Sequence, residues 1–331
     1  MKKNLIFFFV LIIIFFFLFL LTFREIYGNK NLLINKEKIF DIKKGESIIE
    51  IASNLEKEKI IENKFSFVLY LFLKGDEKKI QAGKYLLEPD LKIYQMVDKF
   101  ISGDTIKIKI TIPEGYNLKE VEQEFKKNFK EINFSKFKIG DFKNDFEILK
   151  DVPDEASLEG FLFPDTYFFN PDATEKEIIY TFLKNFSQKI TPDLQKEIKN
   201  QNKSLYEIII IASLIEKEVK TLEDKKIVSG ILWKRLKYEI PLQVDATISY
   251  ITGKKTTKIS LKETQIDSLY NTYKYKGLPK GPISNPGIES IIAAIYPKET
   301  EFFFYLSKPD GETIFSRNAE EHIEAVEKYL R

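Results

Sequence analysis

Hydrophobic residues are concentrated first in an unbroken run near the N-terminus, at positions 5–21 and again, after Thr22, at Phe23. Roughly 20 apolar residues at 1.5 Å each span the hydrocarbon core of a bilayer, which is about 30 Å thick. A cleaved signal peptide is the alternative, but its apolar region is usually about 7–15 residues long and ends at small residues. No pair of small residues follows this run. Residues 1–23 are therefore predicted to form a single transmembrane anchor.

Charged residues on both sides of the run indicate its orientation. Lys2 and Lys3 precede it, whereas Arg24 on the other side is followed directly by Glu25. Cytoplasmic flanks carry an excess of Lys and Arg, so the N-terminus is expected in the cytoplasm. The rest of the chain then lies on the periplasmic or extracytoplasmic side of the cell (inner) membrane, and the polar stretch 24–38 is expected to be a juxtamembrane linker.

Short apolar segments with two different periods follow at 39–104. Segments with strand character alternate with segments whose apolar positions recur at the spacing of an amphipathic helix. Strands are predicted at 39–42 and 83–86, and helices from 48 onward, over 64–73 and over 93–100. These elements are enough for one compact α+β module at 39–104.

Beyond residue 104 the pattern again mixes strands and helices. Residues 106–112 alternate strictly between apolar and polar, which is typical of a strand buried on one face. A Ser, Thr or Asn followed three residues later by Glu forms a capping box, and such boxes mark helix starts at Asn117, Thr174 and Ser204. Further elements are helices over 205–220, 223–237, 287–295 and 318–330, a strand at 302–306 and irregular structure over 238–286. The predicted fold class is α+β, with a mixed α+β domain at 105–331.

Composition then restricts the chemistry. The chain has no Cys and one His, which argues against a cysteine nucleophile, a thiolate metal site and a multi-His zinc site. With 52 Lys+Arg against 50 Asp+Glu the net charge is +2, so no nucleic-acid partner is indicated. An enzyme of this composition would depend mainly on carboxylates, Lys or Tyr for proton transfer, and no metal or cofactor is expected.

Two glutamates at the end of the helix at 205–220 are candidates for such a carboxylate. Glu216 and Glu218 lie about 200° apart on a helix, so they face opposite sides. Ala212 and Ser213, one turn before Glu216, are small and would leave room for a ligand. Burial beside an apolar run raises the pKa of a carboxyl toward neutrality, and this favours Glu216 as a general acid. The alternative is a solvated last turn without a catalytic role.

Polar and aromatic side chains gather in three further segments. The runs at 241–247, 269–275 and 277–287 place Asn, Gln and Asp beside aromatic or rigid apolar residues, a combination that suits sugars. A packed Ω-like loop held by structural Pro and Gly is the alternative. Glu159 and Asp165 could be second carboxylates, or could cap and orient neighbouring helices. His322, on the last predicted helix, is expected to be a surface or capping residue.

Several segments resemble the endolytic murein transglycosylase (YceG-like) family. They are SLEGFLFPDTY at 157–167, ASLIEKE at 212–218, LQVDAT at 242–247, YNTY at 270–273, GLPKGPISNPG at 277–287 and EEH at 320–322. The run KGESIIEIA at 44–52 is similar to a LysM-like module, and it and the anchor stand where the family has them. One departure is Ala246, where the family more often has Pro. The resemblance implies a LysM-like module at 39–104 and a YceG-like catalytic domain at 105–331.

The resemblance also implies an activity and its residues. The family cleaves the β-1,4 bond between MurNAc and GlcNAc in nascent peptidoglycan strands and so limits strand length. The family's catalytic Glu corresponds to Glu216, which would protonate the glycosidic oxygen while the MurNAc C6 hydroxyl attacks C1 and leaves a 1,6-anhydro end. Residues expected to hold the sugars are Gln243, Asp245, Asn271, Tyr273 and Asn285, with Glu218 as a supporting group or alternative acid.

Two other functions remain open at this point. A hydrolytic muramidase would use water together with a second carboxylate, either Asp245 or Glu159, and would leave reducing ends. A non-catalytic adaptor would bind peptidoglycan through the LysM-like module and hold a cell-wall synthase near the membrane. The expected partners are therefore glycan strands, the membrane through one helix, and a glycosyltransferase or transpeptidase.

Overall fold

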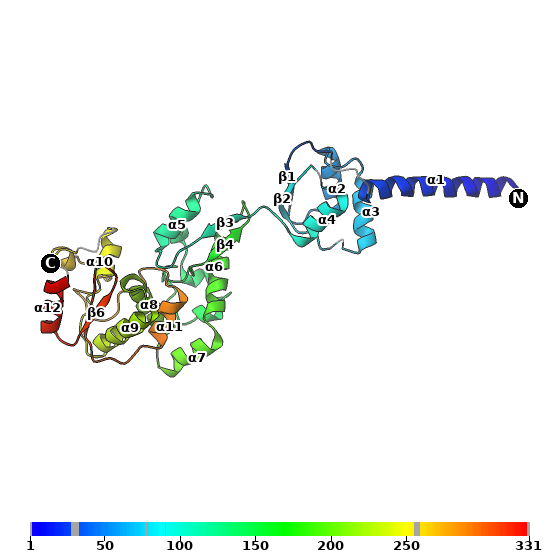
Figure 1. Ribbon diagram of the computed structural model, residues 1–331. Helices are drawn as coiled ribbons and strands as arrows, with labels where there is room; N and C mark the ends of the chain where they lie inside the picture. Colours follow the sequence, from blue (N-terminus) through cyan, green and yellow to red (C-terminus); the bar gives the residue numbers. More distant parts are fainter. Residues whose placement is uncertain (1, 28–32, 77, 90, 255–258, 330–331) are drawn as a thin grey trace. The chain divides into compact units, whose positions relative to one another are not determined.

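The computed structural model describes residues 2–27, 33–76, 78–89, 91–254 and 259–329. These residues form two compact units. The first comprises residues 1–108 with 168–172, and the second comprises 109–167 with 173–331. The fold is mixed α+β, as the sequence predicted (Figure 1). The domain boundaries proposed from the sequence stay a prediction.

The apolar run near the N-terminus forms one long helix, α1 (Lys2–Tyr27). Its segment Phe7–Arg24 has a mean hydropathy of 2.8 and is not buried inside the protein at all. Among the described residues it is the one helix long and apolar enough to cross a membrane. The helix is thus confirmed as an element, and its length and composition fit an anchor.

The first unit also holds a small α+β module. Its elements are β1 (Lys38–Ile42), α2 (Ile48–Lys57), α3 (Lys64–Lys74), β2 (Gly83–Leu87) and α4 (Ile93–Ser102). β1 and β2 pair antiparallel, with Phe40 opposite Tyr85, and both rings are buried with Phe67 and Phe100 in one core. All the helices and strands predicted over 39–104 are present. The likeness of this module to LysM stays a prediction.

The remaining elements belong mostly to the second unit. They are β3 (Ile108–Thr111), α5 (Leu118–Lys126), η1 (Phe134–Lys136), η2 (Ile139–Phe142), η3 (Glu147–Leu149), β4 (Thr166–Phe169), α6 (Glu175–Lys189), α7 (Pro192–Asn200), α8 (Leu205–Glu218), α9 (Leu222–Lys237), α10 (Asp245–Thr252), η4 (Glu263–Gln265), α11 (Ile288–Ile295), β5 (Phe304–Ser307), β6 (Thr313–Ser316) and α12 (Ala319–Tyr329). β3 pairs with β4, and β5 pairs antiparallel with β6.

Three helices form the centre of the second unit. α8 packs against both α9 and α11, and α9 also packs against α11 (Figure 1). The Trp233 indole on α9 donates to the Ala294 carbonyl on α11 at 2.9 Å. At Gly230 of α9 the chain just after α11 approaches so closely that a Cβ would lie 2.1 Å from the Lys298 carbonyl oxygen. The last turn of α8, where both candidate glutamates lie, belongs to this group of helices.

The predicted helix starts are confirmed at each capping box. Asn117, Thr174 and Ser204 each accept a hydrogen bond from the backbone three residues on, and the Glu there bonds back to the cap. These reciprocal bonds satisfy amide groups that a helix start otherwise leaves without partners. The capping side chains therefore determine where α5, α6 and α8 begin.

Some predicted boundaries were wrong. The stretch 238–286, expected to be irregular, contains α10, which begins without a side-chain cap at Val244. The strand expected over 106–112 is limited to β3, and the helix expected to reach residue 220 ends at Glu218, because Val219 is extended. The sequence did not predict α7, β4 or β6.

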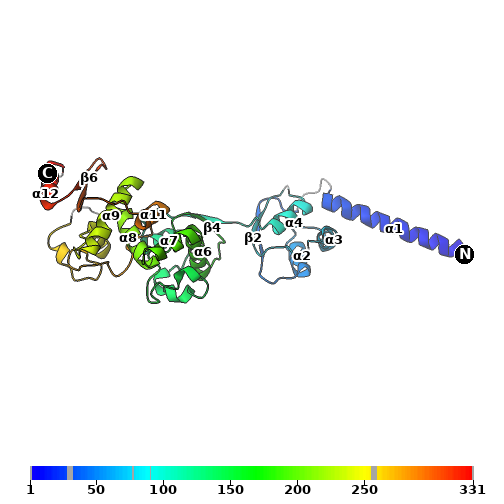
Figure 2. The same ribbon diagram turned by 90° about the horizontal axis from the view of Figure 1, so that it is seen from below.

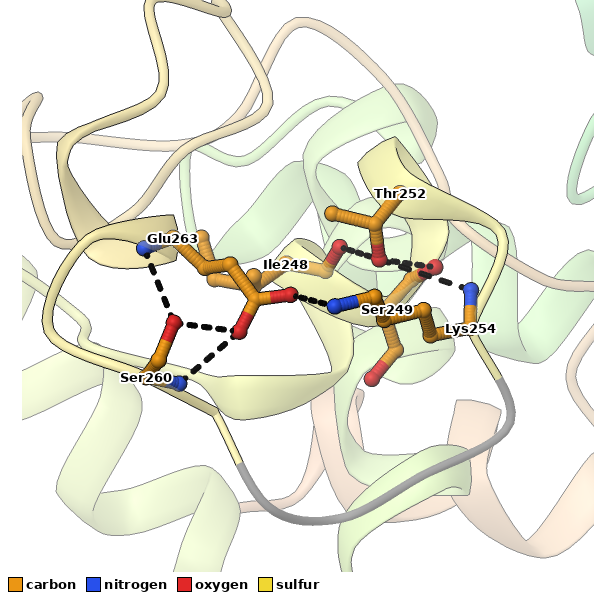
Figure 3. A network of polar contacts seen from close by, with 6 residues as sticks. All are labelled: Ile248, Ser249, Thr252, Lys254, Ser260 and Glu263. Atoms are coloured by element: carbon orange, nitrogen blue, oxygen red, sulfur yellow. Dashed lines mark hydrogen bonds and ion pairs between the residues drawn. The ribbon is translucent and has the colours of Figure 1, made fainter.

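A polar network joins the end of α10 to η4 (Figure 3). The Glu263 carboxylate accepts from the Ser260 amide at 2.9 Å and from the Ser260 hydroxyl at 2.6 Å. Its other oxygen bonds the Lys254 ammonium, which follows α10. The Thr252 hydroxyl donates to the Ile248 carbonyl inside α10. These contacts secure the segment that leads toward Tyr273.

Candidate active site

α8 presents its two glutamates to different surroundings. Every residue of α8 from Ile208 to Ile215 is buried, so the helix is enclosed until its last turn. Glu216 and Glu218 follow in that turn, about 200° apart. Each is only partly exposed, and each meets a different set of neighbours.

Glu216 faces α9 and α11. One carboxylate oxygen accepts from the Gly287 amide at 3.0 Å and from the Ser290 hydroxyl at 2.6 Å. The same oxygen lies 3.5 Å from the ammonium of Lys225, whose side chain is 3% exposed. Glu216 therefore accepts from the N-terminal turn of α11 and pairs with a buried cation of α9, contacts that hold three helices together.

The space expected beside Glu216 is filled by protein. Ser213 is fully buried, and its hydroxyl accepts from the Ile283 amide at 3.1 Å. Its carbonyl accepts from the Ser284 hydroxyl at 3.1 Å. The small residues Ala212 and Ser213 thus admit the loop that precedes α11, and the expectation that they leave room for a ligand was wrong.

Glu218 faces the opposite side of α8, toward α10 and β5. Burial, and after it the negative charge of Asp245, raise the pKa of its carboxyl, which reaches about 7 in all. Hydrogen bonds from the Tyr305 hydroxyl and the Ala246 amide oppose this rise. A carboxyl with a pKa near 7 is protonated often enough at neutral pH to serve as a general acid. These surroundings support Glu218, the alternative acid, while the assignment of the acid to Glu216 drawn from the sequence stays a prediction.

Two of the predicted sugar-binding residues lie in the same cluster. Asp245 is the first residue of α10, and its carboxylate accepts from the Tyr273 hydroxyl. Burial raises the pKa of the Asp245 carboxyl above its ordinary value, and the Tyr273 hydrogen bond opposes this. Glu218, Asp245 and Tyr273 therefore form one connected group of polar side chains from α8, α10 and the loop after it.

Gln243 stands at the edge of this group. The backbone amide of Gln243 donates to the Thr272 carbonyl at 3.0 Å, while the side chain is exposed. Its φ of 52° lies in the left-handed region, which a non-glycine residue adopts at a cost of about 1–2 kcal/mol. Strained residues of this kind concentrate at functional sites, because the surrounding structure must hold them in place.

Arg235 is a member of the cluster that the sequence did not reveal. Its guanidinium is buried and donates to the Phe303 carbonyl at 2.8 Å and to the Leu242 carbonyl at 2.9 Å. A third hydrogen bond reaches the Gln243 side chain at 3.4 Å. It therefore ties α9 to the residues before β5 and to the LQVDAT segment. In the sequence it appeared only as one basic residue among several in the last turn of α9.

Asn271 has its side chain occupied within its own loop. Its amide nitrogen donates to the Thr264 and Ile266 carbonyls at 3.0 and 2.8 Å, and its oxygen accepts from the Tyr273 amide at 2.9 Å. The side chain is 1% exposed. This structure gives Asn271 the role of holding Tyr273 in position, and direct contact with sugar stays a prediction.

Asn285 is likewise enclosed. Its side-chain oxygen accepts from the Gly160 and Leu162 amides, both at 2.9 Å, and its nitrogen donates to the Tyr116 carbonyl at 2.9 Å. It is fully buried. Asn285 thus connects the loop before α11 with two segments far away in the sequence, and its contact with sugar also stays a prediction.

Glu159 and Asp165 have structural partners. Both oxygens of Glu159 lie 3.0 Å from the Leu118 amide at the start of α5, and one also accepts from the Tyr250 hydroxyl at 3.2 Å. Burial raises the pKa of Glu159 to about 8. Asp165 accepts from the Thr166 amide at 2.8 Å. Glu159 is only 1% exposed, so it has no open face toward a substrate, and the orienting role is favoured.

No group of three or more His, Cys, Asp or Glu that could hold a metal ion occurs among the residues that the structure describes. His322 does not stand free on the surface, because its ring stacks on Phe304 with centroids 5.2 Å apart.

Comparisons with known proteins match most of this chain. The YceG-like family matches residues 40–328. The endolytic murein transglycosylase of Bacillus subtilis is 34% identical over 307 residues, which cover 88% of this chain and 84% of that protein. The protein of the same name from Streptococcus pneumoniae is 30% identical over 319 residues, and the match spans 87% of this chain but only 58% of its relative.

A solved structure is similar as well. The crystal structure of a yceG-like protein from Listeria monocytogenes is 30% identical and matches with a TM-score of 0.60, covering 88% of this chain and 99% of that one. The resemblance found in the sequence motifs is therefore confirmed. The chain belongs to the YceG-like family.

Proposed function

We propose that this protein is a peptidoglycan lytic transglycosylase with Glu218 as its general acid. The relatives named endolytic murein transglycosylase support the activity. The observation that carries the residue assignment is the enclosure of the Glu218 carboxyl beside Asp245, which itself bonds Tyr273; this environment raises the pKa of Glu218 to about 7. Glu216, to which the family's catalytic Glu corresponds, is the alternative acid; its carboxylate already bonds Ser290 and lies next to Lys225.

The proposed reaction needs one carboxyl group and no cofactor. Protonated Glu218 gives its proton to the oxygen of the β-1,4 bond between MurNAc and GlcNAc, and the bond from that oxygen to C1 breaks. Glu218, now ionised, takes the proton of the MurNAc C6 hydroxyl as this oxygen bonds to C1. The products are a strand ending in 1,6-anhydro-MurNAc and a strand with a free GlcNAc hydroxyl, and Glu218 is protonated again.

Side chains around Glu218 would position the sugars. Tyr273 and the exposed Gln243 offer an aromatic face and an amide, which suit C–H faces and hydroxyls. Asp245, close enough to raise the pKa of Glu218, would stabilise the positive charge that develops on the sugar ring. Asn271 and Asn285 would act through the loops they hold, since their side-chain groups are already bonded to backbone.

Hydrolysis is the second candidate, and the proximity of Asp245 to Glu218 favours it. Ordinary glycosidases use two carboxylates that flank the scissile bond. Asp245 could activate a water in place of the sugar hydroxyl, and the products would then carry reducing ends. The Asp245 carboxylate accepts a hydrogen bond from Tyr273, an arrangement that would orient it in either reaction.

The location of the enzyme is part of the proposal. α1 is proposed to anchor the protein by one membrane span, with the N-terminus in the cytoplasm and the second unit on the outer side. The module at 39–104 is proposed to bind glycan in the manner of LysM, and a cell-wall synthase is the proposed partner. This placement would bring the site to glycan strands as they leave the membrane.

Two matched variants test the assignment of the acid. Glu218→Gln and Glu216→Gln each replace a carboxyl group by an amide of nearly the same shape, on opposite sides of one helix turn. Full-length protein in detergent micelles is incubated with peptidoglycan, and the products are separated and weighed by mass spectrometry. We expect anhydro products from the wild type, none from Glu218→Gln, and reduced but measurable amounts from Glu216→Gln.

Each other outcome has a clear meaning. Loss of activity in a well-folded Glu216→Gln, with activity retained in Glu218→Gln, would return the acid to Glu216. Reducing ends from the wild type would replace transglycosylation by hydrolysis. Intact strands with every variant, wild type included, would favour the adaptor function. Circular dichroism and thermal unfolding show which variants are folded.

A further inference from the structure

Helix α3 is apolar on two faces, although it needs only one of them for its own core. Between Lys64 and Lys74 its sequence is FSFVLYLFL, in which every residue except Ser66 is aliphatic or aromatic. Phe67 and Leu71 are fully buried in the core of the first unit. A helix that is hydrophobic all round is normally enclosed on all sides by protein or lipid.

The second face is exposed and continuous. It consists of four large side chains, with exposed fractions of 70%, 38%, 68% and 69%: Phe65, Leu69, Phe72 and Leu73. Their spacing of i, i+4, i+7 and i+8 places them within about 100° of the helix circumference. We call this set the α3 stripe. Single exposed apolar residues are common, but a contiguous stripe marks a surface that meets another apolar phase.

The position of α3 identifies that phase. α3 and α4 both pack against the end of α1 that is nearer the module, as Figures 1 and 2 show. The Tyr27 ring on α1 lies 5.8 Å from the Tyr70 ring on α3 and 5.8 Å from the Tyr94 ring on α4. Tyr27 comes shortly after the apolar segment Phe7–Arg24. α3 is therefore next to the place where a spanning helix would leave the bilayer.

We propose that the α3 stripe inserts into the boundary between headgroups and acyl chains of the outer leaflet. The proposal rests on the proposed membrane anchoring by α1. Apolar side chains of an interfacial helix are buried about 5–10 Å into this boundary, and tyrosines are common at the same depth. Lys64 begins the helix and Lys78 follows it, so two cationic groups flank the helix near the level of anionic phosphates, whereas the ammonium of Lys74 already pairs with Asp98.

Two contacts with the membrane would restrict the orientation of the first unit more than a single contact does. A single spanning helix leaves the attached module free to tilt and rotate, whereas a second, interfacial helix defines which of its sides faces the lipid. The α3 stripe would thus fix the orientation of the module at the membrane surface. The occupant is lipid, because α3 packs against the end of α1, the helix that is itself expected to be in lipid.

The absence of cysteine makes the test direct. Single-cysteine variants of the full chain are labelled with a small environment-sensitive fluorophore and reconstituted in vesicles of phosphatidylethanolamine and phosphatidylglycerol. Leu73→Cys and Phe65→Cys report on the α3 stripe. Phe15→Cys reports on the span of α1, and Lys43→Cys, an exposed residue between β1 and α2, serves as the water-exposed control.

The expected result is a pattern across two quenchers. Labels at 65 and 73 should be quenched by lipids that carry a nitroxide near the headgroup and should lose most of the iodide quenching seen at 43. The label at 15 should respond to lipids with the nitroxide deep in the chain. Because both stripe positions are exposed, cysteine should not disturb folding, and agreement between them guards against a local artefact.

Other patterns overturn the proposal in distinguishable ways. The labels at positions 65 and 73 could be quenched by iodide as strongly as the label at 43, while the label at 15 is quenched by the nitroxide lipids. The α3 stripe would then be in water, and the anchoring by α1 would stand. If 15 is also open to iodide, the anchoring fails and the proposal fails with it. Protection from both quenchers, together with disulfide-linked dimers of Leu73→Cys, would show that a second copy of the chain covers the stripe.

Discussion

Replacing Asp245 by Asn is expected to move the basic limb of the pH–activity profile to lower pH. The charge of Asp245 is, after burial, the next cause of the raised pKa of Glu218. Asparagine has nearly the same shape and can still accept the hydrogen bond from Tyr273, but it carries no charge. The pKa of Glu218 should therefore fall below its wild-type value of about 7.

The size of the effect follows from the fraction of Glu218 that carries a proton. At pH 7.5 a carboxyl with a pKa of about 7 is protonated in roughly one molecule in four, against about one in a thousand for the ordinary 4.5. The rise of the Glu218 pKa from 4.5 to about 7 thus increases the protonated fraction at pH 7.5 about 240-fold, which corresponds to about 3 kcal/mol. A nearby like charge contributes on the order of one pKa unit. The variant should lose up to about tenfold in kcat/KM above pH 7 and little at pH 5.

The assay is kcat/KM for the release of soluble fragments from peptidoglycan, measured from pH 5 to 9 with full-length protein in micelles. Asp267→Asn is the matched control, because Asp267 is exposed, pairs with Lys274 and is not among the groups that act on Glu218. The readout is the pH at the midpoint of the basic limb, and not the maximum value of kcat/KM. An unchanged midpoint in Asp245→Asn, or a wild-type midpoint near 4.5, would refute the reasoning.

Two further predictions concern stability. The pKa of Glu159 is raised from 4.5 to about 8, so its contribution to folding is complete below about pH 4.5 and is lost as the pH rises through 8. Between pH 4.5 and 8 the unfolding free energy of the wild type, measured by urea titration, should fall by on the order of 5 kcal/mol more than that of Glu159→Gln. The same pH dependence in both proteins would contradict this. Gly230→Ala should lower the unfolding free energy by about 1–3 kcal/mol despite the higher helix propensity of Ala, because the new Cβ would lie 2.1 Å from the Lys298 carbonyl oxygen; a raised Tm would count against it.

Local signals predicted the elements well where the physics itself is local. The capping boxes at Asn117, Thr174 and Ser204 are complete within four residues, and the structure has each of them. α10 was missed because Val244 has no capping side chain and its helix is only eight residues long. Its formation depends on contacts with distant segments, such as the hydrogen bond from the Val244 amide to the Thr272 hydroxyl.

The choice between the two glutamates shows where sequence reasoning ends. The helical period correctly separates Glu216 from Glu218 by about 200°, but it does not say which face is open. Ala212 and Ser213 suggested an opening beside Glu216, whereas a loop about 70 residues later in the chain fills that space. Small residues indicate close approach, and only the fold decides whether the approaching group is a ligand or the chain itself.

The side-chain amides of the candidate sugar-binding residues also show what the sequence does not reveal. Asn271 and Asn285 belong to segments whose composition suits sugar binding, and the sequence cannot tell a free amide from one that is already bonded. In the structure both are enclosed and bonded to backbone groups. Arg235 is the converse case, since its burial beside Gln243 arises from the packing of α9 against the residues before β5.

The hydrogen bonds of Asn285 have a consequence for the order of events during synthesis. They join residues 125 and 169 positions apart, and the loop that contains Asn285 also bonds to Ser213 on α8. Contacts of such long sequence separation form late, because the entropy of closing large loops must be overcome first. A ribosome has to extend the chain past residue 285 before the end of α8 can be enclosed. A chain truncated before residue 285 would therefore lack the contacts that enclose the end of α8.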